Sequence, residues 1–592
     1  MINLLASELI VTADNAANIM GEYFWALVPA ITAIVLALIT KEVYISLFLG
    51  VFVGGMISAG GNPINALREI FEIMAGSMGP EVDSTGAVVG AGNAGILIFI
   101  LELGILVAMM NKAGGAKAFG NWVHTHVKSR KGAMLATTGL GCLMFMDDYF
   151  NRLAVGSIMQ PINDKYRISR AKSAFLVGSI SVSICILIPV SSWASAISGY
   201  IGEGLGDSVD SFGVYIKTIF SNFYPILLIL FLATTSLLGI DLFGMVKHEH
   251  TAIKTGDLLC GLEASRGDEE VDFSPKGKVI DLVLPILVLV ASCCTLLLVK
   301  DGDGVNYFST NTALAMGGCI AVLFCLILYL PRKLMTLKEY TGCFGTGFKS
   351  IADVFIILVF AWALTGVCES LNLSLFVTAF ATWMGEADKL LPAIFFLAAM
   401  GTAFATGTSW GTFGIMVPIV APMGAAIGFD LMVLTIAAVL SGSVFGDQVS
   451  PISDATILSA AACKSNHLGY VKAQLPNALL VAAIALVSFL VAGLTSIIWL
   501  GWIVAAVLFV ALIVVAYTTQ KKNGLLACVA GYERSRGKRA SCRIITIENQ
   551  QSKRSLIFRL LFLCNFFLST FSNSYNYKKI FPCRHVFLRA FT

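Results

Sequence analysis

The chain has 592 residues, of which 57% are hydrophobic and only 13% charged. A soluble domain is typically about 45–50% apolar and about 25% charged, so this composition is typical of a polytopic membrane protein and excludes a disordered chain, a coiled coil, a small disulfide scaffold and a large soluble enzyme. The net charge of +4 is uneven, because residues 519–592 hold 14 of the 40 Lys and Arg but only 2 of the 36 Asp and Glu.

Eleven stretches are long and apolar enough to cross a bilayer, which takes roughly 20 residues in a helix. They cover residues 24–40, 43–59, 93–111, 173–201, 222–240, 279–299, 312–330, 351–371, 431–463, 474–495 and 497–517. Two of these, 173–201 and 431–463, contain polar residues and a proline. Two further stretches, 132–161 and 391–424, are apolar at both ends and polar or glycine-rich in the middle. The predicted fold is therefore an all-α polytopic membrane protein.

The charges of the connecting segments alternate along the chain. Basic residues concentrate at 112–131, 165–172, 332–349, 464–472 and 521–522, whereas acidic residues concentrate at 8–22, 69–83, 203–210, 301–303 and 386–388. Because cytoplasmic loops are enriched in Lys and Arg, the N-terminus is expected outside and the C-terminal tail inside. This orientation makes 132–161 a re-entrant hairpin from the inside and 391–424 one from the outside. The alternative is that each crosses the membrane fully.

The two proline-containing spans resemble each other. Pro189-Val-Ser191-Ser192 matches Pro451-Ile-Ser453-Asp454 at an offset of 262, and Ser181-Val-Ser183 matches Ser441-Gly-Ser443 at an offset of 260. With the hairpins, this pattern predicts an inverted repeat, with repeat one at about 93–240 and repeat two at about 351–495. Inverted repeats with discontinuous helices are typical of secondary transporters.

The middle of the first hairpin carries two adjacent acids, Asp147 and Asp148, followed by Asn151 and Arg152. Charged residues at membrane depth are costly unless they are paired or hydrated, so they mark functional sites. Arg152 has the spacing to pair with Asp148 on a helix. A carboxylate in an apolar environment binds a proton more readily, which predicts Asp147 or Asp148 as the proton carrier. The alternative is a structural Asp–Arg pair at the hairpin tip.

The other breaks offer oxygen ligands for a hard cation. The second broken helix holds two carboxylates and several hydroxyl groups around a proline, so Asp447 and Asp454 are predicted to bind sodium directly. Unwound backbone and hydroxyl groups complete the predicted site for sodium or another substrate. The predicted site consists of Asn151, Ser191, Ser192, Thr406, Thr408, Ser409, Asp447, Ser450, Ser453 and Asp454. Asp454→Asn is expected to abolish exchange and leave folding intact. Glu102, deep in its span, is a further candidate.

These residues carry a resemblance to a known family. Met146-Asp147-Asp148-Tyr149, Gly407-Thr408-Ser409-Trp410-Gly411-Thr412 and residues 446–454, from Gly446 to Asp454, resemble the NhaC-type sodium/proton antiporters. The resemblance covers roughly residues 20–517, and its last motif is the most specific. It implies exchange of external protons for internal sodium across a bacterial plasma membrane. It also implies a homodimeric scaffold and a mobile transport domain that moves like an elevator.

The sequence leaves the substrate open, because relatives in the same superfamily exchange organic acids such as malate or carry amino acids. A sodium-coupled organic-anion or amino-acid exchanger is therefore the alternative. No enzymatic activity, cofactor or nucleic-acid partner is expected, since there is no catalytic constellation, no Cys-x-x-Cys pair and no basic groove. Residues 1–23 are expected to form an extracytoplasmic segment and 24–517 the transporter domain. Residues 518–592 form a basic tail, for which a functional segment and an appended end both remain open.

Overall fold

The computed structural model describes residues 11–522, apart from residues 13, 41, 83–87, 206–209, 265–275 and 301–306. The first part of this chain comprises α2 (Ala16–Glu22), η1 (Phe24–Leu27), α3 (Val28–Thr40), α4 (Val43–Ser58), α5 (Pro63–Ser77), α6 (Gly92–Ala113), α7 (Gly115–His126), α8 (Arg130–Leu143), α9 (Asp148–Lys165), α10 (Arg170–Cys185), α11 (Ser192–Leu205), α12 (Ser211–Ile219) and α13 (Phe223–Leu238). Two short strands, β1 (Glu81–Val82) and β2 (Val88–Gly90), pair antiparallel before α6.

The second part comprises α14 (Gly244–Thr255), α15 (Ile280–Leu298), α16 (Thr310–Tyr329), α17 (Leu337–Ser370), α18 (Leu373–Met384), η2 (Gly385–Leu390), α19 (Leu391–Thr406), α20 (Ser409–Val420), η3 (Ala421–Met423), α21 (Gly424–Ile427), α22 (Phe429–Val449), α23 (Asp454–Ala462), α24 (His467–Thr495) and α25 (Ile498–Lys522). Residues 523–592 of the basic tail, and Glu8, Asp83, Asp207, Asp301 and Asp303 of the acidic connections, lie outside the described residues.

The prediction of an all-α polytopic membrane protein is confirmed. Within the described residues, nine helices are long and apolar enough to cross a membrane, and three sharply bent helix pairs raise the number to twelve. The largest bend, 118°, separates α4 from α5. One span is longer than predicted, since α17 begins at Leu337 instead of residue 351. Its start is fixed by a capping box, in which Thr336 and Glu339 satisfy each other's backbone N–H groups.

Both proline-containing spans are broken helices. Pro189 and Pro451 lie in the gaps between α10 and α11 and between α22 and α23, because proline has no N–H group to continue a helix. Ser191 and Ser453 start the second halves, each accepting a hydrogen bond at 3.1 Å from a backbone N–H of the following turn. The two extra residues of repeat two lengthen α22, which continues to Val449 and thereby carries Asp447 on a turn that α10 lacks.

The two predicted hairpins pack on the broken helices of their own repeat. Met146, between α8 and α9, accepts a hydrogen bond from the Ser192 backbone N–H at 3.1 Å. In repeat two, the Ser450 hydroxyl group donates to the Phe404 carbonyl of α19 at 2.7 Å. Gly407, at the tip between α19 and α20, has φ +72°, and a Cβ there would lie 3.0 Å from the Ile452 backbone. This tip therefore needs glycine for its conformation and for its close approach to the break.

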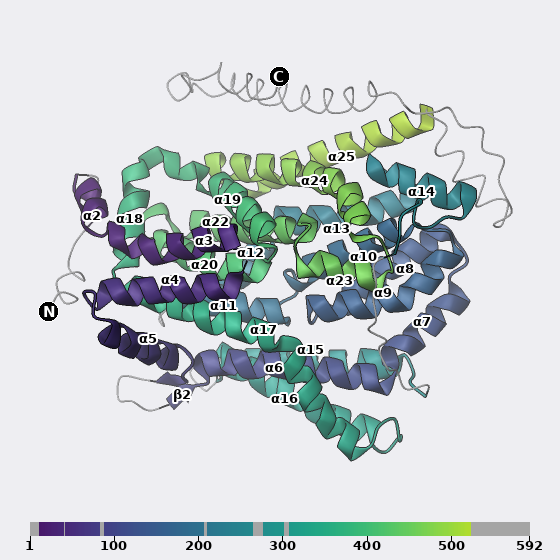
Figure 1. Ribbon diagram of the computed structural model, residues 1–592, viewed down its shortest axis with the longest axis horizontal. Helices are drawn as coiled ribbons and strands as arrows, with labels where there is room; N and C mark the ends of the chain where they lie inside the picture. Colours follow the sequence, from purple (N-terminus) through teal and green to yellow (C-terminus); the bar gives the residue numbers. More distant parts are fainter. Residues whose placement is uncertain are drawn as a thin grey trace.

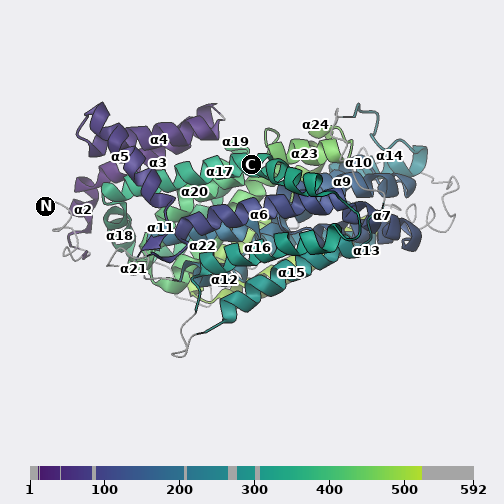
Figure 2. The ribbon, with the colours of Figure 1, turned by 90° about the horizontal axis from the view of Figure 1, so that it is seen from below.

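The two predicted hairpins lie towards opposite ends of the molecule. Figures 1 and 2 both show α9 and α10 towards the end that holds α7 and α14, and α11, α20 and α22 towards the end that holds α2 and α18. The broken helices meet between these ends. Around one side of them, α6, α15, α16 and α17 form a separate group of long helices. Glycines bring these helices close, since a Cβ at Gly104 of α6 would lie 2.8 Å from the Gly347 carbonyl of α17.

Buried ion pairs tie α14 to the end at which α8 begins. Arg130 at the start of α8 pairs with Glu249 of α14, and both side chains are almost fully buried. Glu249 also accepts the Ser169 backbone N–H at 2.7 Å, just before α10. These contacts connect the first hairpin and the first broken helix to one surface helix.

Candidate functional site

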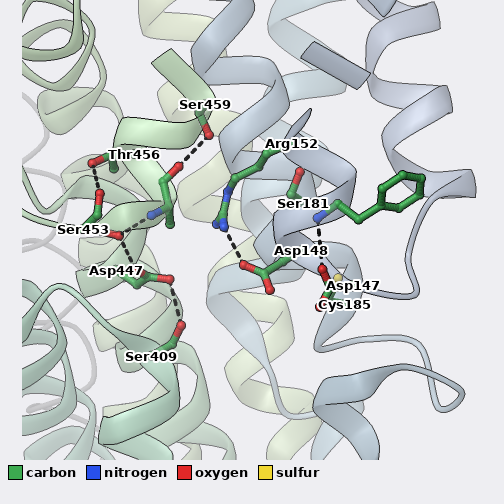
Figure 3. A network of polar contacts seen from close by, with 12 residues as sticks. Asp147, Asp148, Arg152, Ser181, Cys185, Ser409, Asp447, Ser453, Thr456 and Ser459 are labelled. Atoms are coloured by element: carbon green, nitrogen blue, oxygen red, sulfur yellow. Dashed lines mark hydrogen bonds and ion pairs between the residues drawn. The ribbon is translucent and has the colours of Figure 1, made fainter. Parts of the chain in front are cut away.

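Asp447 lies at the centre of a polar network between the second hairpin and the second broken helix (Figure 3). Ser409, the first residue of α20, donates its hydroxyl group to one carboxylate oxygen at 2.8 Å. Ser453, from the break after α22, donates to the other at 2.5 Å. The Asp447 side chain is buried, and it forms no ion pair among the described residues. A buried carboxylate outside an ion pair is costly, so this position favours a bound proton or cation.

Asp148 and Arg152 form the structural pair that their spacing predicted. The Arg152 Nη1 group lies 2.5 Å from a carboxylate oxygen of Asp148, and both side chains are buried. The indole N–H of Trp193, at the start of α11, donates to the other Asp148 oxygen at 3.1 Å. Asp148 thus has both a counter-charge and a second donor. This arrangement favours the structural interpretation of Asp148 over its predicted role as proton carrier, which stays untested.

Asp147 has a different environment from its neighbour. Its carboxylate caps the N-terminus of α9 by accepting the Phe150 backbone N–H at 3.0 Å. It forms no ion pair within the part of the chain that the structure describes. Its exposed fraction of 9% exceeds the 1% of Asp148 and the 4% of Asp447. Of the two acids at this tip, Asp147 is therefore the one that can exchange a proton without first breaking an ion pair.

Asn151 and the serines of the first broken helix lie beside the first hairpin tip. Asn151 donates to the Gly141 carbonyl of α8 at 2.8 Å, and its side-chain oxygen has no partner in the described part of the chain. Ser191 donates to the Cys185 carbonyl at 2.6 Å, so it closes the end of α10. The buried hydroxyl group of Ser192 likewise has no partner among the described residues. Asn151 and Ser192 therefore offer free oxygen atoms, whereas Ser191 caps helix ends.

The remaining hydroxyl groups of the second hairpin and break act on the backbone. Thr406 donates to the Thr402 carbonyl, which precedes it by one turn of α19, at 2.8 Å. Thr408 is the N-cap residue of α20 without a side-chain capping bond. Ser450 links the break to α19, as described above. Of the predicted ligands in repeat two, the structure brings Ser409 and Ser453 into direct contact with Asp447.

Asp454 lies apart from this network. It is an exposed residue at the start of α23, and the acidic side chains close to it are Asp353 of α17 and Glu42, just before α4. Asp454 shares no hydrogen-bond partner with Asp447 within the described residues, and the joint role of the two carboxylates in holding an ion stays a prediction. Glu102 is also elsewhere, buried in α6 against Gly318 of α16.

Four contacts of the site were not foreseen from the sequence. Trp193 supplies a donor to Asp148, and its ring packs edge-on against Trp410 with centroids 5.6 Å apart. Gln448, which follows Asp447, bonds to Tyr224 of α13 and to Ser179 of α10. The position of Trp193 directly after the repeated serines was a usable signal, whereas Tyr224 lies in an ordinary apolar span.

Unpaired donors gather where α11 meets α17 and α20. The indole N–H groups of Trp362 and Trp410 and the hydroxyl groups of Ser195 and Tyr200 are buried and have no hydrogen-bond partner among the residues that the structure describes. A Cβ built on Gly199 would lie 3.3 Å from the Trp362 indole nitrogen, and one on Gly414 would lie 3.3 Å from the Tyr200 hydroxyl oxygen. These groups suit an acceptor such as a carboxylate, since an indole N–H cannot coordinate a cation.

The chemistry of the network follows from its charges. The network contains three carboxyl groups, from Asp147, Asp148 and Asp447, and one guanidinium group, from Arg152. Arg152 is close enough to Asp447 to act on it electrostatically, although its ion pair is with Asp148. Full ionisation would leave an excess of two negative charges in a dry environment, which protons or a small cation would neutralise.

The chain is similar to known antiporters. A model of the Na+/H+ antiporter family matches residues 184–494, which include α11, the second hairpin and the second broken helix. An uncharacterized protein of Haemophilus influenzae is 33% identical over 520 residues, or 84% of this chain and 96% of its own length. The malate-2H(+)/Na(+)-lactate antiporter of Bacillus subtilis is 38% identical over 106 residues, which are 17% of this chain and 22% of that protein. An uncharacterized Na(+)/H(+) antiporter of Haemophilus influenzae is 43% identical over 76 residues, which are 13% and 16% of the two chains.

Proposed function

The chain belongs to the Na+/H+ antiporter family, and from this premise we propose that it exchanges sodium for protons across the plasma membrane. As a multi-pass secondary antiporter it needs no energy source other than an ion gradient. The observation that carries the proposal is the buried Asp447 carboxylate, which two hydroxyl groups orient and which forms no ion pair among the described residues.

Competition for Asp447 is sufficient for coupling. The carboxylate and the hydroxyl oxygens of Ser409 and Ser453 are hard ligands of the kind that sodium prefers. A protonated Asp447 is a poor cation ligand, so proton and sodium exclude each other at this position. Asp147, which has no ion-pair partner in the described chain, would bind a proton in addition to the one on Asp447. Asp148 and Arg152 would keep the site assembled between these two acids.

We further propose that the hairpins and broken helices of the two repeats, α8–α11 and α19–α23, move as one body against α6, α15, α16 and α17. The contact between these groups contains small residues, such as Gly414 of α20 against Ala361 of α17. Small side chains give a smooth surface that one group can slide along, as an elevator-like mechanism requires. Thr408→Cys, at the tip of the second hairpin, tests this idea: its labelling by a membrane-impermeant thiol reagent should switch sides of the membrane when the sodium gradient is reversed. The homodimer and the outside position of the N-terminus, which resemblance and loop charge predict, are part of the same proposal.

Sodium-coupled exchange of an organic anion is the second candidate. The unpaired donors of Trp362, Trp410, Ser195 and Tyr200 favour it, as does the likeness to a malate/lactate antiporter. A carboxylate seated at these donors would place its negative charge near the hairpin tip that also holds the cation.

Proteoliposomes that contain a pH-sensitive dye separate the two candidates. An imposed proton gradient should collapse when sodium is added without any organic acid. A response only in the presence of malate or lactate would replace sodium/proton exchange by the second candidate. A response to neither sodium nor an organic acid would contradict both.

A further inference from the structure

Gln448 connects the site of repeat two to the helices of repeat one. Its side-chain oxygen accepts a hydrogen bond from the Tyr224 hydroxyl group of α13 at 2.6 Å. Its side-chain nitrogen donates to the Ser179 hydroxyl oxygen of α10 at 2.7 Å. Its backbone carbonyl accepts the Gln474 side-chain amide of α24 at 2.7 Å. One residue thus binds three helices, two of which belong to repeat one.

This arrangement needs an amide at position 448. A carbonyl oxygen that accepts and an NH2 group that donates match the Tyr224 hydroxyl group and the Ser179 oxygen, which lie on different helices. Glutamate would accept at both ends and bury a further negative charge, and an apolar residue would leave both partners unpaired. The side chains of Gln448, Tyr224 and Ser179 are all buried, so water does not replace the lost bonds.

Because Gln448 directly follows Asp447, the hydrogen bonds of Gln448 also fix the position of the Asp447 backbone. Both residues lie in the last turn of α22, where the final backbone carbonyls have no partner within the helix. Gln474 satisfies one of those carbonyls, and the Gln448 side chain anchors the same turn from the opposite side. The Asp447 carboxylate extends from this turn to Ser409 and Ser453, which belong to other segments. A shift of the turn would therefore alter the cation site without touching any of its ligands.

We propose that Gln448 is a positioning residue through which repeat one sets the sodium affinity of Asp447. The proposal rests on the sodium site proposed above. In it, Gln448 does not touch the ion. It fixes the last turn of α22 against α10 and α13, so the packing of the first broken helix determines the geometry at the second. The two inverted repeats are then coupled at the site itself.

Gln448→Met tests the inference, because methionine keeps the length of the side chain and removes its hydrogen bonds. The sodium concentration at half-maximal exchange should rise on the order of tenfold, as expected for the loss of two hydrogen bonds, while the rate at saturating sodium stays within about twofold of the wild type. Tyr224→Phe, which removes one oxygen atom, should give a smaller rise in the same direction. Gln520→Met, at a buried glutamine near the end of α25, is the matched control and should change neither quantity.

Sodium-dependent thermal stability of the purified protein supplies an independent measure of binding. If the wild type shows no sodium response in either measurement, the proposed function fails. If the wild type responds and both Gln448→Met and Tyr224→Phe keep its sodium affinity, the positioning role is refuted and the function stands. A fall in the saturating rate alone would also refute it, because that result indicates a general structural effect. If Gln448→Met does not fold, Tyr224→Phe decides the question.

Discussion

Replacement of Asp447 by asparagine is the sharpest test of the sodium site. Asparagine has nearly the same shape as aspartate, and the Ser409 and Ser453 hydroxyl groups can turn to bond with an amide. The substitution therefore removes one charge and little else. Because it also removes a buried carboxylate that forms no ion pair among the described residues, the sodium-free protein should be at least as stable as the wild type.

The size of the effect follows from electrostatics. At an effective dielectric constant of about 20, two unit charges roughly 4 Å apart interact by about 4 kcal/mol. Loss of that attraction weakens binding by roughly a thousandfold, since about 1.4 kcal/mol corresponds to a factor of ten. Two uncharged serine ligands do not compensate for it. Sodium at about 100 times its dissociation constant stabilises a protein by about 2.7 kcal/mol, and this stabilisation should disappear in the variant.

Two assays on the purified Asp447→Asn variant give the result. Sodium-driven collapse of a proton gradient in proteoliposomes should be lost, and the melting temperature should no longer rise with sodium concentration. The melting temperature without sodium serves as the folding control. Exchange within about threefold of the wild type would refute the reasoning, because it would place the ion away from Asp447.

Asp454→Asn is the matched comparison, since it changes the same chemical group seven residues further along the chain. The sequence predicted that this substitution abolishes exchange, but Asp454 is exposed and lies near Asp353 and Glu42. From its position we expect a rise in half-maximal sodium concentration of no more than about threefold, which is typical of an exposed charge. A loss as complete as that of Asp447→Asn would place both carboxylates in one site.

Three further predictions concern the framework of the site. Arg152→Gln should destabilise the protein by roughly 3–5 kcal/mol, because it leaves the buried Asp148 charge unpaired, and the melting temperature measures this loss. Gly446→Ala should lower the free energy of unfolding by about 1–3 kcal/mol, again followed by the melting temperature, because its Cβ would lie 2.5 Å from the Phe404 backbone nitrogen. Gly401→Ala in α19 is the control, since a Cβ there would meet no described atom within 4 Å. Glu249→Gln should expose the start of α8 to proteolysis by breaking its buried ion pair, and an unchanged cleavage pattern would contradict this expectation.

Much of this architecture could be predicted because a bilayer allows few backbone conformations to cross it. Apolar stretches of about 20 residues have few alternatives to a transmembrane helix, and a proline among polar residues at that depth predicts a break. Pro189 and Pro451 therefore indicated both broken helices. The Asp148–Arg152 pair was predictable for another reason, since residues four apart on a helix are neighbours whatever the tertiary structure.

The sequence by itself thus determined the membrane fold, the breaks, the local ion pair and the polar segments from which a site could form. Only the tertiary structure decided which of these segments meet. It joined Ser409 and Ser453 to Asp447, left Asp454 exposed near α17, and bound Gln448 to Tyr224 and Ser179. The physical reason is that a hydrogen bond acts over about 3 Å, whereas these residues are brought together from distant helices by the packing of whole helices. Local spacing contains no information on that packing, so only the fold distinguishes the environments of the two carboxylates Asp447 and Asp454.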